Sequence, residues 1–274
     1  MTIPDGVNLV PIVLTLLVAA AAAGFLAGLF GIGGGAIFVP VLYQTFETLG
    51  VSHLVSMHLA VGSSIAIIVP TSIRSLTSHL KRGAVDMTLL KQWLVAIPLG
   101  AVIGALAASV ASSAELRAIF ATLAFLLGLK MLVGRLSFRL GDDLPGGFGR
   151  FVAGFVIGIL SALMGIGGGV LNNTFMTLYG RPIHQAVATS AGVGALIAIP
   201  GLLAYVAGGW GEAALPAFSL GYVNVFAVGL VAPASILAVP LGAALAHRLS
   251  RRQMELGFGC FLLIVAARFA WSLI

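Results

Sequence analysis

The sequence predicts an all-α integral membrane protein built from two inverted-topology repeats. Each repeat is expected to hold a glycine-interrupted helical hairpin followed by three transmembrane helices, giving roughly eight to ten membrane segments in total. Three observations predict this fold: the composition is strongly apolar, a five-residue glycine motif occurs twice, and the basic residues are clustered. Apolar residues make up 60% of the chain and charged residues 8%, whereas about a quarter of a soluble protein is charged.

The helices are predicted from apolar runs, of which a full membrane crossing needs about 20 residues. Leu14 to Ala23 is apolar and ends in small residues, as in a secretory signal, but Met1 to Asn8 contains no basic residue. We therefore interpret this segment as the first structural helix. The predicted runs are 7–30, 36–49, 53–77, 87–110, 115–134, 150–165, 170–180, 184–206, 222–246 and 254–273.

The glycine motif Gly31-Ile32-Gly33-Gly34-Gly35 returns as Gly165-Ile166-Gly167-Gly168-Gly169. Three further stretches recur in the same order, which indicates a duplication with a first repeat at 1–140, a cytoplasmic linker at 141–150 and a second repeat at 151–274. These pairs are Ala60-Val-Gly-Ser-Ser64 with Ala186-Val-Ala-Thr-Ser190, Gly83-Ala-Val-Asp86 with Gly221-Tyr-Val-Asn224, and Ala96-Ile-Pro-Leu-Gly-Ala101 with Ala238-Val-Pro-Leu-Gly-Ala243.

The orientation of the repeats follows from the basic residues, because short cytoplasmic loops are rich in Lys and Arg. Lys81 and Arg82 precede Gly83, whereas the equivalent loop before Gly221 has no basic residue. Equivalent loops should therefore lie on opposite sides of the membrane, with both termini on the outer face. The same bias explains the net charge of +6 without a nucleic-acid partner. The four clusters are Arg74, Lys81, Arg82 and Lys91; Lys130, Arg135, Arg139 and Arg150; Arg181; and Arg248, Arg251 and Arg252.

The short segments 150–165 and 170–180 would measure about 24 and 16 Å as helices, less than the roughly 30 Å of a bilayer core. They fit a re-entrant hairpin with the glycine turn near mid-membrane. The segments 7–30 and 36–49 allow the same interpretation, but 7–30 is also long enough to cross alone. Counting crossings does not separate the two possibilities.

The glycine turns are the predicted binding site for a small anionic substrate. Consecutive glycines expose backbone N–H groups, and the helix that follows adds the positive end of its dipole. The alternative is that the glycines only allow close helix packing. The pattern Gly-x-Gly-x-x-Ala at Gly31 to Ala36 does not predict a nucleotide site, because no βαβ unit surrounds it. The glycines assigned to the site are Gly31, Gly33, Gly34, Gly35, Gly165, Gly167, Gly168 and Gly169.

Polar residues near the turns complete the predicted site. Asn172 and Asn173 open the helix after the second turn, where they could bind an anion or cap the helix. Ser63 and Ser64 recur as Thr189 and Ser190 and could line the site, or their hydroxyls could bond back to the preceding helical turn. Arg74 could hold a carboxylate or sulfonate, or extend to the membrane surface.

Metal and cofactor chemistry is not expected. Cys260 is the one cysteine, and the five histidines are not spaced as helical metal ligands. The chain lacks an intramembrane cluster of His, Asp or Cys, so an intramembrane enzyme is not predicted. Inverted repeats are typical of secondary transporters, which bind substrate near the bilayer midplane. The expected partners are the lipid bilayer, a small anion, and a coupling proton or other ion, while the oligomeric state is not determined.

These duplicated motifs together resemble the TauE/SafE family of sulfite and organosulfonate exporters, over about residues 20–272. The resemblance implies a multi-pass permease of the bacterial inner membrane that moves sulfite or sulfonates such as sulfoacetate, and the inverted repeats predict export by alternating access. It also implies that Arg74 departs from the family pattern, where a small polar residue is more common. The alternatives are an anion channel and a carrier of another carboxylate or oxyanion.

Overall fold

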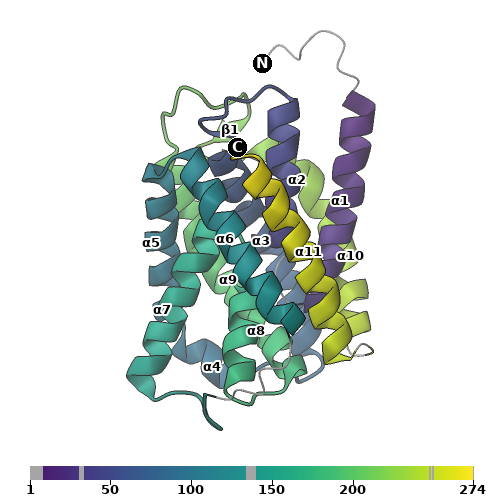
Figure 1. Cartoon of the computed structure of the whole chain (residues 1–274), viewed down its shortest axis with the longest axis vertical. Coiled ribbons are helices and arrows are strands. Elements are labelled where there is room, and N and C mark those ends of the chain that lie inside the picture. Colours follow the sequence, from purple (N-terminus) through teal and green to yellow (C-terminus); the bar gives the residue numbers. More distant parts are fainter. Residues whose placement is uncertain (1–8, 31–33, 134–139, 247, 249, 274) are drawn as a thin grey trace.

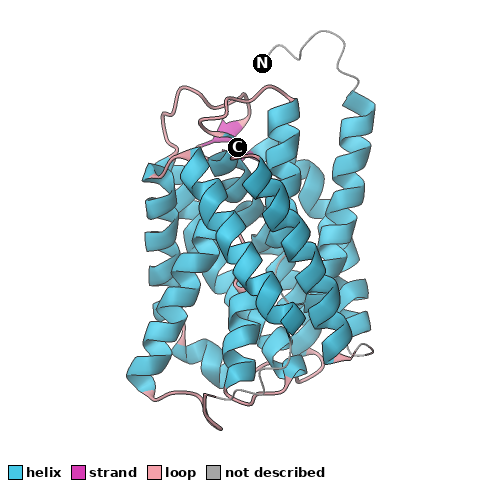
Figure 2. Cartoon of the chain, viewed as in Figure 1, coloured by secondary structure: helices cyan, strands magenta, loops and turns pink. Residues whose placement is uncertain are grey.

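The computed structural model describes residues 9–30, 34–133, 140–246, 248 and 250–273. Within these ranges the chain is almost entirely helical, with one two-stranded antiparallel hairpin (Figure 2). The elements are α1 (Leu9–Phe30), α2 (Gly35–Thr48), α3 (Ser56–Leu80), α4 (Met87–Gln92), α5 (Ala96–Val110), α6 (Ser113–Val133), α7 (Gly147–Met164), α8 (Gly169–Leu178), α9 (Ile183–Gly208), β1 (Ser219–Leu220), β2 (Val223–Asn224), α10 (Val225–Ala246) and α11 (Arg251–Trp271).

Five of the described helices, α3, α6, α7, α9 and α10, are long and apolar enough to cross a membrane. In an apolar stretch of 18 residues in α3 and in α9, 72% and 67% of the stretch is buried inside the protein, whereas in the other three helices about one third or less is buried. Large apolar side chains cover the outer faces of these three helices, including Phe125, Phe151 and Leu237. Such a surface would aggregate in water but is what lipid requires. The protein is therefore an all-α, multi-pass membrane protein, as predicted.

α1 and α2 form one helical hairpin, α7 and α8 form another, and the two hairpins open toward opposite ends of the bundle (Figure 1). α1 begins and α11 ends at the end that we call the terminal end, and α2 also lies there (Figure 1). α8 and α4 lie at the opposite end, beside the start of α7 (Figure 1). In each hairpin a long helix leads into a glycine turn and a shorter helix returns.

For many contacts between two helices, the equivalent helices of the other half make the same contact. α1 packs against α10, and α7 packs against α5 in the same way. α2 lies on α3 as α8 lies on α9, and α3 also contacts α10 as α9 contacts α5. At the centre α3 meets α9, and at the periphery α6 meets α11. Every helix of one half is thus packed against the other half, either directly or through α3 and α9.

The repeated Pro-Leu-Gly-Ala stretches lie where helices of the two halves pack closely. A Cβ atom on Gly100 would lie 2.1 Å from the carbonyl oxygen of Phe155, and one on Gly242 would lie 1.7 Å from that of Phe25. Helices in membranes approach this closely only at small residues. The copy of the motif in α5 therefore allows close contact with α7, and the copy in α10 allows close contact with α1.

One apolar run does not form the single helix that its length suggests. The run 87–110 is divided into α4 and α5 at Trp93, which ends α4. Trp93 is fully buried, and its indole Nε1 donates to the carbonyl oxygen of Arg150 at 2.8 Å. This anchor to α7 interrupts the helix. The pair β1 and β2, in the loop before α10, was not predicted either.

Candidate functional site

The second glycine turn is built by two glycines in the left-handed region. Gly165 (φ 63°) ends α7. Its N–H donates to the carbonyl oxygen of Ala162, and the N–H of Ile166 donates to the carbonyl oxygen of Ser161. This pair of bonds is the Schellman arrangement that stops a helix. Gly168 (φ 69°) then precedes α8. The whole turn from Gly165 to Gly169 is buried, so the break predicted between 165 and 170 lies in the protein core.

The first turn is described only in its last two residues. Gly34 has φ 82° and precedes α2, just as Gly168 precedes α8. Gly34 and Gly35 are both buried. Gly31 and Gly33, which were assigned to the site from the sequence, lie outside the described residues. The described parts of the two turns thus share one conformation at the start of the returning helix.

The two turns are in direct contact. A Cβ atom on Gly35 would lie 2.1 Å from the carbonyl oxygen of Gly165 and 2.8 Å from the Cα of Ile166. Ser64 donates a hydrogen bond to the same Gly165 oxygen at 2.8 Å. Only a residue without a side chain fits at position 35 in this arrangement. The fold therefore brings together the two motifs that stand 134 positions apart in the sequence.

The helices that leave the turns begin without side-chain caps. In α2 the Ile37 and Phe38 N–H groups bond to the Gly34 carbonyl oxygen, and in α8 the Asn172 N–H bonds to that of Gly168. No side-chain cap bond is made at Gly34 or Gly168, whereas Asp86 caps α4. A buried helix start without caps presents polar N–H groups and the positive end of the helix dipole. Both features favour an anion.

The amide side chains after the second turn form a cluster with Ser190. Asn172 is fully buried, and its Nδ2 donates to the hydroxyl oxygen of Ser190 at 2.6 Å. The Ser190 hydroxyl donates to Oδ1 of Asn173 at 2.7 Å. In the described part of the chain, Oδ1 of Asn172 has no hydrogen-bond partner. The cluster joins α8 to α9 next to the turn, and neither asparagine side chain caps α8.

Ser63 and Thr189 hold the two halves together at equivalent places. Thr189 accepts a hydrogen bond from the Asp86 N–H at 2.9 Å, and Ser63 accepts one from the Asn224 N–H at 2.8 Å. The Asp86 and Asn224 side chains in turn accept from Leu89 and Ala227, both at 2.9 Å. All four hydroxyl residues of the repeated pairs are buried. Their described bonds reach other segments rather than the preceding helical turn.

Asp86 and Asn224 were not singled out from the sequence as members of this arrangement. Each precedes a helix at a cap position, which is the signal that could have identified them. Their contact with the opposite half depends on tertiary packing, which no local pattern specifies.

Arg74 does not join the cluster. It is exposed on α3, while Ser72 and Ser75 beside it are buried. Ser72, not Arg74, lies near the second turn. Gly194 on α9 is close to both: a Cβ atom there would lie 3.1 Å from the Ser72 side chain and 3.2 Å from the carbonyl oxygen of Gly167. The predicted role of Arg74 in holding substrate thus has no support from its position.

The space at the second turn is small in this conformation. A cavity of about 10 Å³ is lined by Ser161, Gly168 and neighbouring apolar residues, which is room for one water molecule at most. Ser161 is fully buried, and its hydroxyl has no partner among the described residues. A sulfur oxyanion would need the surrounding helices to separate. The second turn, which is described in full, is buried in this conformation.

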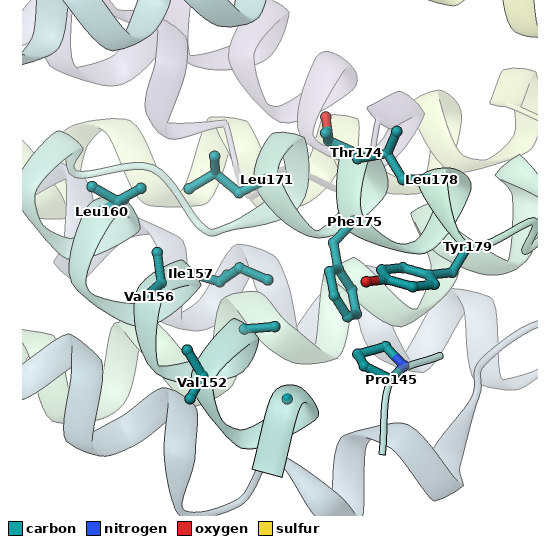
Figure 3. Close-up of a pocket in the computed structure, with 12 residues that line it drawn as sticks. Pro145, Val152, Val156, Ile157, Leu160, Leu171, Thr174, Phe175, Leu178 and Tyr179 are labelled. Atoms are coloured by element: carbon teal, nitrogen blue, oxygen red, sulfur yellow. The ribbon is translucent and has the colours of Figure 1, made fainter. Parts of the chain in front are cut away.

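An apolar cleft lies beside the second hairpin. It has a volume of about 410 Å³ and lies between α7, α8 and the segment before α7 (Figure 3). Phe175 and Tyr179 face Pro145 across it (Figure 3), and Thr174, which accepts a hydrogen bond from Lys130 at 3.1 Å, contributes a hydroxyl group. The lining suits hydrocarbon rather than an anion.

The chain matches one family and several curated relatives. The model of the sulfite exporter TauE/SafE family matches residues 16–269. A protein of Haemophilus influenzae named a probable membrane transporter protein is 34% identical over 259 residues, covering 93% of this chain and 96% of its own length. Probable membrane transporter proteins of Methanocaldococcus jannaschii and Bacillus subtilis are 27% and 24% identical and cover 85% and 91% of this chain, and 86% and 94% of their own lengths. No solved structure matches the chain significantly.

Proposed function

The chain belongs to the TauE/SafE family of sulfite exporters, and from this premise we propose that it exports sulfite or small organosulfonates such as sulfoacetate. That it is a multi-pass membrane transporter follows from its relatives and its apolar helices. The substrate class and the alternating-access mechanism are the proposed part. The protein acts as a secondary transporter of the bacterial inner membrane, and no cofactor or chemical step is involved.

The contact between the two glycine turns is the observation that carries the proposal. Gly35 touches the Gly165 carbonyl group, and the uncapped starts of α2 and α8 follow directly. When the turns separate, the N–H groups of both helix starts can face the same anion. Transporters with broken helices bind anionic groups in this way. Asn172 then adds an amide side chain, and Ser64 adds a hydroxyl group.

We propose that the two halves are inverted repeats that rock against each other. The paired helix contacts and the opposite directions of the two hairpins support this proposal (Figure 1). Equivalent glycines also share their conformation: φ is 82° and 69° at Gly34 and Gly168, and 63° and 55° at Gly83 and Gly221. The repeat boundaries predicted from the sequence remain predictions.

We assign the terminal end of the bundle to the outer face. Apart from Arg74 in α3, the described basic residues of the four clusters lie in segments near the opposite end, around α4, α8 and the starts of α7 and α11 (Figure 1). Short loops rich in Lys and Arg lie in the cytoplasm. Both termini then lie outside the cell, and substrate moves from the opposite end to the terminal end during export.

The proposal is tested with purified protein in proteoliposomes and radiolabelled sulfite. We expect saturable uptake, acceleration of uptake by unlabelled sulfite trapped inside, and competition by sulfoacetate. Counter-transport of this kind distinguishes a carrier from a channel. Electrical conductance without counter-transport would support an anion channel instead, and transport of carboxylates but not of sulfite or sulfonates would contradict the proposed substrate class.

A further inference from the structure

Arg117 and Arg268 are the two basic residues outside the four cytoplasmic clusters. They lie far apart in the sequence, at the start of α6 and near the end of α11. The fold brings both to one polar pocket of about 180 Å³ at the terminal end. This terminal pocket is lined by Tyr43, Gln44, Glu47, His53, Arg117, Arg268 and Ser272.

Each guanidinium group is held in place by a short hydrogen bond. Nη1 of Arg117 donates to the carbonyl oxygen of Ser272 at 2.6 Å, and the group lies 5.9 Å from the centre of the Tyr43 ring. Nη2 of Arg268 donates to Oε1 of Gln44 at 2.6 Å. A guanidinium group has five N–H donors, so the bonds made among the described residues leave donors on both arginines. The two cations are positioned in advance of any ligand.

The charge of the terminal pocket is positive. Its one carboxylate, on Glu47, forms an ion pair with His53, while the arginines are always protonated. The sum of two arginines and one carboxylate is +1. A volume of about 180 Å³ holds several water molecules at about 30 Å³ each. This space and charge suit a small oxyanion, whose oxygens guanidinium groups bind in pairs.

The pocket at the opposite end is balanced in charge by comparison. It has a volume of about 470 Å³ and contains Arg150 and Arg181, but also Asp86 and Asp143. Arg181 pairs with Asp143 at 3.4 Å. Arg150 donates two bonds to the carbonyl oxygen of Pro145, at 3.2 and 3.0 Å. The net positive charge is thus a feature of the terminal pocket and not of this second pocket.

We propose that the terminal pocket is an outer-face binding site for the transported oxyanion, with Arg117 and Arg268 as its ligands. This inference rests on the proposed function and names a second place where the same substrate binds. The arginines hold the sulfite or sulfonate group after it leaves the glycine turns and before release. Glu47 opposes this binding, because its carboxylate repels the anion, and so limits how long the substrate stays.

The test measures sulfite exchange in proteoliposomes whose protein orientation is known, with the sulfite concentration varied on one side at a time. We expect Arg268→Gln to raise the KM for outer sulfite about tenfold, because the substrate loses one charge-assisted hydrogen bond. The KM for inner sulfite should stay within about twofold. Glu47→Gln should change the outer KM in the opposite direction. Arg117→Gln should act like Arg268→Gln, with thermal unfolding as a check on its tie to Ser272.

Arg248→Gln is the matched control, because it removes one exposed basic charge outside the terminal pocket. Its outer KM should equal that of the unchanged protein. If Arg268→Gln leaves the outer KM unchanged, or raises the KM equally from both sides, while sulfite exchange is intact, the outer site is contradicted and the proposed function stands. If the unchanged protein exchanges no sulfite from either side, both proposals fail.

Discussion

Replacing Gly35 by valine should reduce sulfite transport below detection and lower the thermal stability of the purified protein. A Cβ atom at this position would lie 2.1 Å from the Gly165 carbonyl oxygen and 2.8 Å from the Cα of Ile166. Both neighbours are backbone atoms, so no side-chain rotation relieves the overlap. Overpacking a core costs about 1–3 kcal/mol and occasionally more, and we expect Gly35→Val at the upper end. The two turns can then no longer meet around one anion.

The matched control is Gly229→Ala on α10. Gly229 is also helical, but a Cβ atom there meets nothing within 4 Å. We expect this change to leave transport intact and to stabilise the helix by about 0.5–1 kcal/mol. The measurements are radiolabelled sulfite uptake and thermal unfolding. Full uptake by Gly35→Val would contradict the assignment of the turn contact to the substrate site.

Replacing Asn172 by aspartate should abolish transport at neutral pH while the protein still folds. The two side chains have the same shape, and the Ser190 hydroxyl can turn away from Asn173 to donate to the carboxylate. A negative charge about 5 Å from a substrate anion, at an effective dielectric constant of about 20, repels it by about 3 kcal/mol. That energy corresponds to more than a hundredfold loss of affinity. Uptake at neutral and at acid pH is the measurement, since protonating the carboxylate should restore part of the activity.

Asn224→Asp is the control for this experiment. It places in the second half the residue that the first half already has at Asp86, and either side chain can cap the following helix. Transport should remain. If Asn172→Asp transports sulfite as well as Asn224→Asp does, Asn172 does not lie beside the substrate.

The helices were largely predictable because membrane segments are read from composition. The apolar runs 170–180 and 184–206 correspond to α8 and α9 within two residues at each end. The run 87–110 was not divided correctly, since the break at Trp93 depends on its hydrogen bond to Arg150, far away in the sequence. Hydropathy indicates whether a segment lies in lipid or in water, but it does not indicate which distant residue the segment bonds to.

The glycine turns were predictable from repetition, and their contact agrees with what an inverted arrangement would give. Arg74 was assigned to the site because an arginine in an apolar run is unusual, but the helix places it at the surface. Arg117 and Arg268 lie far apart in the sequence, and only the packing of α6 on α11 brings them to one pocket. Side-chain clusters formed by distant helices have no local signal.

The most direct test of the central claim is whether the glycine turns open alternately to both faces. Ser161 is suited to the measurement, because it is fully buried and a Cβ on Gly168 would lie 3.3 Å from its hydroxyl. Ser161→Cys is made with Cys260, which is exposed, replaced by serine. A membrane-impermeant thiol reagent is added to right-side-out or inverted vesicles. The account predicts labelling from both sides, slowed by sulfite. Labelling from one side only, at a rate that sulfite does not change in a protein that still transports, would contradict it.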